Sequence, residues 1–401
     1  MLDLILKNAL PFPGSERMDV AIENGKIAAV EPDIGVPAAQ TIDASGLLLI
    51  PSFVDSHMHL DKALVAGEKD PDGLMASIRI SGEYQRSVPA DRVVEDILSR
   101  ARRVVEMEIV NGSGALKSHV LIDPVWGIAG LTAILELKRE FRGVIDIFNI
   151  VPWHPDYKGE LDRAAKAGEI DFLAGYPTLT PDYRAAVDEV FERALKFSLP
   201  VDLHVDESDE PNIDCFEYVL QKTIETSMQG RVNCSHVTAL CAVDDLRAAR
   251  AIELCAKAEV NIITLPSCNM YLMGRKDSQP IRRGITRVHE FLQAGVNVAY
   301  ASDNIRDPFR PFGNGDMLEE GLFAAQVMQY GTADQLAEVL RMGTYRAARN
   351  TLIEGYGLCP GCAADLTLID APSAKEALIG RGARRFVFKR GKLVAKDGAR
   401  R

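Results

Sequence analysis

The sequence predicts an α/β fold: a (β/α)8 barrel of the TIM type joined to a small β-sandwich domain built from both chain ends. Eight short apolar segments alternate with helical patterns between residues 47 and 302, which is the rhythm of a parallel barrel. Short β patterns separated by turns occupy both ends of the chain, outside that range. A doubly wound sheet is the alternative, but no Gly-rich dinucleotide fingerprint follows the first predicted barrel strand.

Length and composition set the class of protein. The chain has 401 residues, enough for one large domain and a small one. Its net charge of −11 makes nucleic acids and anionic membrane surfaces poor partners. No apolar run reaches the ~18 residues that a membrane span needs, and the first residues lack a signal-peptide pattern, so we expect a cytoplasmic protein. Seven scattered cysteines indicate free thiols, and Cys359-Pro360-Gly361-Cys362 is typical of a turn.

The small domain is expected to comprise residues 1–50 and 358–401. Near the N-terminus the predicted strands are Leu2–Leu6, Val20–Glu23 and Lys26–Val30, with Asn24-Gly25 as a hairpin turn. Near the C-terminus they are Ala364–Ile369 and Arg385–Val394, with a turn at Arg390-Gly391-Lys392. The chain is therefore predicted to return to its own N-terminal sheet.

The barrel is expected to comprise residues 51–357. Its predicted strands are Leu47–Val54, Ala115–Ile122, Val144–Val151, Ile170–Tyr176, Pro200–Val205, Arg231–Val237, Val260–Leu265 and Val296–Ser302. The helical patterns between and after them include Arg92–Ile109, Leu131–Phe141, Tyr183–Phe197, Cys215–Met228, Val243–Ala258, Val288–Ala294, Leu318–Gln329 and Ala333–Ala348.

Six of the seven histidines lie at or near the carboxyl end of a predicted strand, where barrel enzymes build their sites. His57 and His59 follow the first strand two residues apart, a spacing that places both on one face of an extended chain. His204 ends strand five, His236 ends strand six and Asp303 follows strand eight. Three histidines and one carboxylate suit Zn²⁺ or Fe²⁺ and leave a position for water.

Several motifs in these positions resemble the amidohydrolase superfamily, and within it the cytosine deaminase-like branch. They are His57-Met58-His59-Leu60-Asp61, His204 followed by Glu207, Ser235-His236 and Ser302-Asp303. The stretch 266–288 is also similar to this branch. The stretches 301–307 and 311–317 look even closer to isopropylammelide amidohydrolase, an enzyme that removes an alkylamine from a triazine ring. The resemblance runs nearly the whole length of the chain.

The resemblance implies roles for these residues. His57, His59, His204 and Asp303 would hold one divalent metal ion, Zn or Fe, which activates a water. Asp303 would also take the water's proton, and His236 would orient the hydroxide or stabilise the adduct. Glu207 would pass a proton to a ring nitrogen and then to the leaving amine.

Glu207 is the residue that distinguishes a deaminase from a triazine hydrolase in this sequence. It lies three residues after His204, within the acidic run Asp206 to Glu210, and such runs are usually solvated. Its place nevertheless matches that of the deaminase glutamate, which favours a deaminase over a triazine hydrolase. On a continued strand Glu207 and His204 would face opposite ways, so the role requires the strand to end near Val205.

Four further residues are expected to bind the substrate. His154 and Asn304 stand where cytosine deaminase has a glutamine and a second aspartate, and this change predicts a different pattern of donors and acceptors on the ring. Trp153 is either a stacking platform or core filling. Lys62 either contacts the substrate or pairs with Asp61.

The leading hypothesis is therefore a metal-dependent hydrolytic deaminase of an amino-substituted nitrogen heterocycle: cytosine, a related aminopyrimidine or a pterin. The alternative is an N-alkylamino-triazine hydrolase of the isopropylammelide type, which would release an alkylamine instead of ammonia. An inactive scaffold would have lost metal ligands, and all four are present. The only partner expected is a small heterocyclic substrate. The sequence leaves the oligomeric state open, a homo-oligomer included.

Overall fold

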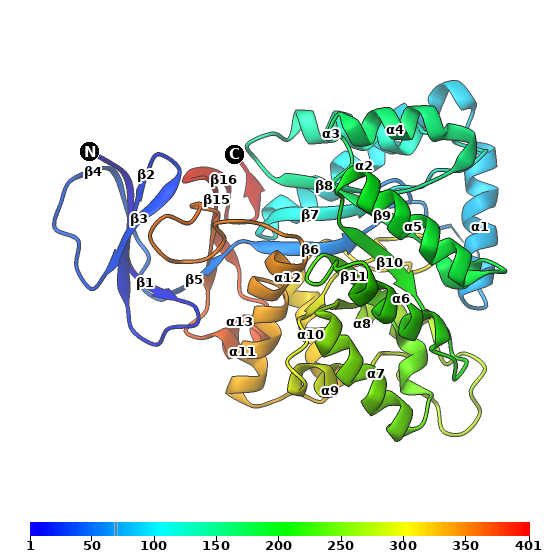
Figure 1. Ribbon diagram of the computed structural model, residues 1–401. Coiled ribbons are helices and arrows are strands. Elements are labelled where there is room, and N and C mark those ends of the chain that lie inside the picture. The colour runs from blue at the N-terminus through cyan, green and yellow to red at the C-terminus, as the bar shows by residue number, and fades with distance from the viewer. Residues whose placement is uncertain (68, 70) are drawn as a thin grey trace.

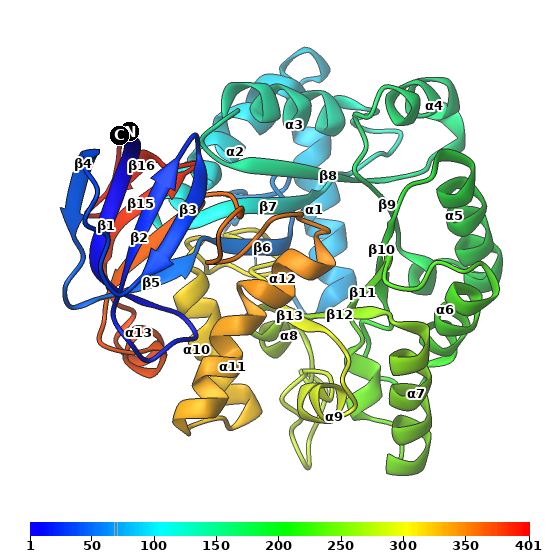
Figure 2. The ribbon, with the colours of Figure 1, turned by 60° about the vertical axis from the view of Figure 1, so that its left-hand side comes forward.

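The computed structural model describes residues 1–67, 69 and 71–401. Eight parallel strands follow one another in chain order around a barrel, and helices surround them. A second sheet of nine strands, blue and red in Figures 1 and 2, lies beside the barrel and draws its strands from both chain ends. The predicted fold class, a TIM-type barrel with a small β domain, is confirmed.

The barrel strands keep the sequence order, each pairing in parallel with the next. They are β6 (Phe53–Met58), β7 (Ser113–His119), β8 (Asp146–Pro152), β9 (Phe172–Gly175), β10 (Val201–Val205), β11 (Val232–His236), β12 (Asn261–Thr264) and β13 (Val298–Tyr300). The last strand returns to the first just beyond its own end, where the Asp303 amide donates to the His57 carbonyl oxygen at 2.9 Å. Closure of the barrel therefore joins two predicted site residues.

Helices fill the connections between strands and follow the barrel. They are α1 (Leu74–Ser87), α2 (Val93–Val110), α3 (Ala129–Glu140), α4 (Lys158–Lys166), α5 (Tyr183–Phe197), α6 (Asp214–Glu225), α7 (Asp245–Ala258), α8 (Pro266–Leu272), α9 (Val288–Gln293), α10 (Met317–Met328), α11 (Ala333–Met342), α12 (Tyr345–Asn350) and α13 (Ala374–Gly380). Helix α1 was not among the predicted helices. Within the described ranges, none of them is long and apolar enough to cross a membrane.

The small sheet is joined across the two chain ends by its central strand. Its strands are β1 (Leu2–Pro11), β2 (Met18–Glu23), β3 (Lys26–Glu31), β4 (Ala38–Asp43), β5 (Leu47–Pro51), β14 (Leu366–Asp370), β15 (Arg384–Lys389), β16 (Lys392–Lys396) and β17 (Ala399–Arg400). Strand β5 pairs with β1 on one side and with β14 on the other. The single strand predicted over Leu47–Val54 is thus wrong: the chain changes sheets at Ser52, and β5 and β6 belong to different sheets.

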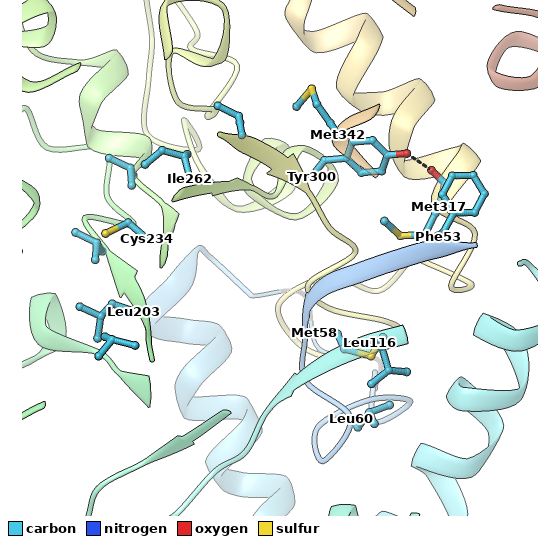
Figure 3. Packing of buried hydrophobic residues seen from close by; sticks show 14 of the residues in the cluster. Phe53, Met58, Leu60, Leu116, Leu203, Cys234, Ile262, Tyr300, Met317 and Met342 are labelled. Carbon is cyan, nitrogen blue, oxygen red and sulfur yellow. Dashed lines mark hydrogen bonds between the residues drawn. The ribbon is translucent and has the colours of Figure 1, made fainter. Parts of the chain in front are cut away.

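Barrel strands β10 and β11 each have one apolar face and one polar face. The register places Leu203 beside Cys234 and Cys234 beside Ile262, and all three belong to the apolar core, as Figure 3 shows. Neighbouring positions on the same strands carry polar side chains, because successive residues of a strand point to opposite faces. Asp202 and Asn233 are paired in this way, as are His204 and Ser235.

Candidate active site

Four side chains converge where strands β6, β10 and β13 end. The Nε2 atoms of His57 and His59 lie 3.5 and 3.4 Å from Asp303 Oδ1, and His204 Nε2 lies 3.3 Å from His59 Nε2. Ligands at the corners of a tetrahedron with bonds of about 2.1 Å lie about 3.4 Å apart. The spacing of these four residues therefore fits a single small metal ion.

The protonation states of these residues also favour the binding of a cation. Burial lowers the pKa of both His59 and His204 well below the usual value, so their rings are neutral at pH 7. Burial alone would raise the pKa of Asp303, but the rings of His57 and His59 beside it bring that pKa well below its ordinary value. Neutral imidazoles and an ionised carboxylate are the states that bind metals.

Two buried polar atoms without hydrogen-bond partners also indicate a metal ion at this position. Within the described residues, His57 Nε2 and Asp303 Oδ2 are buried and have no hydrogen-bond partner. Buried polar groups are nearly always paired, so atoms left without a partner indicate a missing ligand. A divalent cation among the four ligand residues would satisfy the lone pairs that face one another.

A cluster of hydrogen-bonded polar side chains lies next to these four residues. His236 Nδ1 lies 3.3 Å from Glu207 Oε1 and 3.0 Å from the Asn269 amide nitrogen. The same amide donates to Glu207 Oε1 at 3.2 Å. Asn269 comes from helix α8 and is buried; the sequence analysis gave it no role. Its amide fixes the positions of the glutamate and the histidine relative to each other.

Glu207 turns back toward the cavity because strand β10 ends two residues before it. The strand ends at Val205, as the role of Glu207 requires, and Asp206 takes a left-handed backbone conformation with φ of 46°. Burial, together with the nearby Asp303 carboxylate, raises the pKa of Glu207 to about 7, although His236 and Lys62 oppose the rise. A carboxyl group with this pKa can give and take a proton near neutral pH.

A cavity of about 300 Å³ opens over these groups. Helix α1 covers one side and contributes Leu74, Ile78, Ser81 and Gln85, spaced so that they share one face of the helix. The complete lining is His59, Lys62, Leu74, Ile78, Ser81, Gln85, Leu121, Asp123, Tyr176, Leu179, His204, Glu207, His236, Asp303, Asn304 and Phe309. The cavity has the size and mixed character of a small-molecule site.

Two of the four expected substrate-binding residues line this cavity. The Lys62 ammonium lies 4.5 Å from the centre of the Phe309 ring. Asn304 is buried: its amide donates to Asp307 at 2.5 Å, and its Oδ1 accepts from the Cys268 thiol at 3.3 Å. These bonds hold the Asn304 amide in one orientation at the cavity wall.

Trp153 and His154, the other two expected substrate-binding residues, are not among the described residues that line the cavity. Trp153 packs against helix α5, where its ring stacks on Phe197 and lies 4.2 Å from the Arg193 guanidinium. His154 begins a short 3-10 turn and accepts a hydrogen bond from the Asp156 amide at 3.3 Å. Their positions do not support substrate contact. Both follow the end of β8, where the turn of the backbone directs them away from the cavity.

A buried charged layer, which the sequence analysis missed, lies directly beneath the four ligand residues. Lys117 Nζ donates to Asp202 Oδ2 at 2.5 Å, and neither side chain is exposed at all. His119 Nε2 lies 3.5 Å from Asp202 Oδ1, and burial lowers the pKa of His119 to about 3. Lys117 and Asp202 each share a strand face with a histidine two positions further on, which is the signal that could have found them.

The comparisons with known proteins agree with this geometry. The model of the amidohydrolase family matches residues 154–395, more than half of the chain. The chain belongs to the amidohydrolase family. This amidohydrolase is 28% identical over 410 residues to N-isopropylammelide isopropyl amidohydrolase from Pseudomonas sp. (strain ADP), covering 98% of each chain. It is also 28% identical to a pterin deaminase from Rhizobium rhizogenes (strain K84 / ATCC BAA-868), covering 95% of this chain and 89% of that one.

Solved structures show the same similarity in three dimensions. 5-Methylcytosine deaminase from Klebsiella pneumoniae, solved with 5-fluorocytosine, matches with a TM-score of 0.90 and 28% identity over 98% of this chain and 97% of that one. N-isopropylammelide isopropylaminohydrolase from Burkholderia multivorans matches with a TM-score of 0.88 and 26% identity over the full length of both chains. The predicted family is confirmed, and the amidohydrolase is a hydrolase that acts on C–N bonds.

Proposed function

We propose that this amidohydrolase is a metal-dependent hydrolytic deaminase of an amino-substituted nitrogen heterocycle, an aminopyrimidine such as cytosine or a related pterin. Water adds to the ring carbon that bears the amino group, the C–N bond breaks, and ammonia leaves. The observation that carries the proposal is Glu207, which lies beside the four proposed ligand residues with its side chain 13% exposed and its pKa raised to about 7. An amino group is a poor leaving group unless it is protonated and departs as ammonia, so a proton donor at this position suits deamination.

The metal would be held by His57, His59, His204 and Asp303. When bound there, a divalent ion lowers the pKa of water and supplies a nucleophile at neutral pH. We propose one ion, Zn²⁺ or Fe²⁺, because the nitrogen and oxygen donors suit both.

The protein's own groups would then move the protons. Asp303 Oδ2, the oxygen without a hydrogen-bond partner among the described residues, would take the proton of the attacking water. Protonated Glu207 would donate its proton to a ring nitrogen. It would then take the proton of the adduct's hydroxyl group as the C=O bond forms and pass it to the departing amine. His236 would hold the attacking oxygen in place, with its own ring fixed by Asn269.

One observation favours a second candidate, an N-alkylamino-triazine hydrolase. The cavity lining includes four apolar residues, Leu74, Ile78, Leu179 and Phe309, which could accommodate an alkyl group. The similarity to N-isopropylammelide isopropyl amidohydrolase points the same way. The two candidates differ in the amine that leaves.

The test is to incubate the metal-loaded protein with aminopyrimidines, pterins and N-alkylamino-triazines and to measure ammonia and alkylamine separately. We expect ammonia from at least one aminopyrimidine or pterin. Alkylamine without ammonia would replace the proposal by the second candidate. No amine from any compound, by a protein shown to hold metal, would contradict both.

A further inference from the structure

A series of hydrogen bonds runs from His57 to Lys117 beneath the four proposed ligand residues. His57 Nδ1 lies 2.9 Å from Ser235 Oγ, Ser235 Oγ lies 3.4 Å from Asp202 Oδ1, and Asp202 Oδ2 accepts from Lys117 Nζ at 2.5 Å. Asn233 Nδ2 adds a second donor to Asp202 Oδ2 at 3.0 Å. All five side chains are at most 1% exposed, so water does not compete for these bonds.

The donor and acceptor of each hydrogen bond in this series can be assigned by starting from the Lys117–Asp202 ion pair. The Asp202 carboxylate is the acceptor in this layer, because the Lys117 ammonium donates to it at 2.5 Å and the Asn233 amide at 3.0 Å. An ionised carboxylate can only accept hydrogen bonds. The Ser235 hydroxyl has one proton, and in this arrangement it donates that proton to Asp202. Its oxygen is then left to accept from the Nδ1–H of His57.

This direction decides the tautomer of His57. A neutral imidazole carries one proton, and if Nδ1 holds it, Nε2 has a free lone pair. That Nε2 is the atom directed at Asp303 and the other ligand residues. Without the acceptor at Nδ1, the proton could move to Nε2 and block metal binding.

We propose that Ser235 and Asp202 are positioning residues that fix the tautomer and ring orientation of His57 for metal binding, with Lys117 as the buried cation that pairs with Asp202. The inference rests on the metal ion of the proposed function. It also explains why the cluster of His57, His119 and Asp202, whose ligand atoms lie close together, does not need a second metal: the Lys117 ammonium already supplies the positive charge beside Asp202.

The experiment measures the Zn²⁺ dissociation constant of the full-length protein by competition with a chromophoric chelator. Ser235→Ala removes the acceptor but leaves the Lys117–Asp202 pair intact, and Ser235→Thr restores a hydroxyl. We expect Ser235→Ala to weaken Zn²⁺ binding roughly 10- to 100-fold, the usual effect of losing such an outer partner, and Ser235→Thr to stay within a few-fold of wild type. Ser52→Ala is the matched control, because Ser52 is a buried serine whose hydroxyl bonds Thr367 in the small sheet.

Asp202→Asn supplies an independent test of the tautomer. An amide can donate to Ser235, which would reverse the direction of the chain and favour the proton on His57 Nε2. We expect weaker Zn²⁺ binding and an altered visible spectrum of the Co²⁺-loaded protein. If Asp202→Asn does not fold, the comparison of Ser235→Ala with Ser235→Thr alone tests the proposal.

The outcomes separate the two proposals. Equal Zn²⁺ affinity and equal Co²⁺ spectra for wild type and Ser235→Ala would overturn the positioning role and leave the proposed function standing. A loss in Ser235→Ala that Ser235→Thr does not restore, or an equal loss in Ser52→Ala, would also overturn it, because the effect would then be general destabilisation. A wild-type protein that binds no divalent metal would contradict the proposed function and this inference together.

Discussion

Replacing Glu207 by glutamine tests the proton-transfer step most sharply. The amide keeps the shape of the side chain and can still bond to Asn269, but it has no acidic proton to transfer. We expect turnover to fall about 10²- to 10⁴-fold, the usual contribution of general acid–base catalysis, which corresponds to about 2.7–5.4 kcal/mol in the barrier. Metal content should not change, because Glu207 is not among the four proposed ligands.

The pH profile gives this prediction a second measurement. Because burial raises the pKa of Glu207 to about 7, the carboxyl group is about nine-tenths protonated at pH 6 and about one-tenth protonated at pH 8. We therefore expect the wild-type rate of ammonia release to decline above pH 7, and the decline to be absent from Glu207→Gln.

The control is Glu210→Gln, which makes the same change at an exposed position of the same loop. It should leave both the rate and the pH profile unchanged. The reasoning is refuted if Glu207→Gln retains its metal and works within a few-fold of wild type. In that case another group, such as His236, would carry the proton.

Four other changes have defined outcomes. Lys117→Met leaves Asp202 buried without its counter-ion and should lower the free energy of unfolding by about 3–5 kcal/mol; an unchanged urea midpoint would contradict the pairing. His57→Ala should lose metal and activity together, and a full metal content by elemental analysis would remove it from the ligands. Gln85→Leu, at the cavity wall, should raise KM or change substrate preference without loss of metal. His154→Gln should leave the ratio of rates between substrates unchanged, because His154 lies outside the cavity lining; a shifted ratio would restore its expected role.

Much of the site could be predicted because strand ends of a parallel barrel meet at one face. That rule alone placed His57, His204 and Asp303 together, and the requirement that strand five end near Val205 was met. Lys117 and Asp202 could also have been found, since each lies two residues before a histidine on the same strand. Their pairing with each other could not be predicted, because the two residues lie 85 positions apart in the sequence and on strands that are not neighbours.

Other features depend on contacts that the sequence does not reveal. The apolar segment 47–54 has the pattern of one buried strand, and only the hydrogen-bonding partners show that it divides between two sheets. Trp153 and His154 lie one and two residues past the end of β8, where the path of the backbone decides on which side they fall. The buried positions of helix α1 are polar residues, Ser77, Ser81 and Gln85, so no apolar face marks this helix in the sequence, yet it forms one wall of the cavity.

The central claim is that one metal ion held by four residues drives hydrolysis of a ring C–N bond. The most direct measurement strips the protein of metal with a chelator and then titrates it with Zn²⁺ or Fe²⁺ while ammonia release from an aminopyrimidine or pterin substrate is followed. The account predicts no release from the stripped protein, a linear rise with added metal and a plateau at one ion per chain. Ammonia release by the metal-free protein, or a plateau only at two ions per chain, would contradict it.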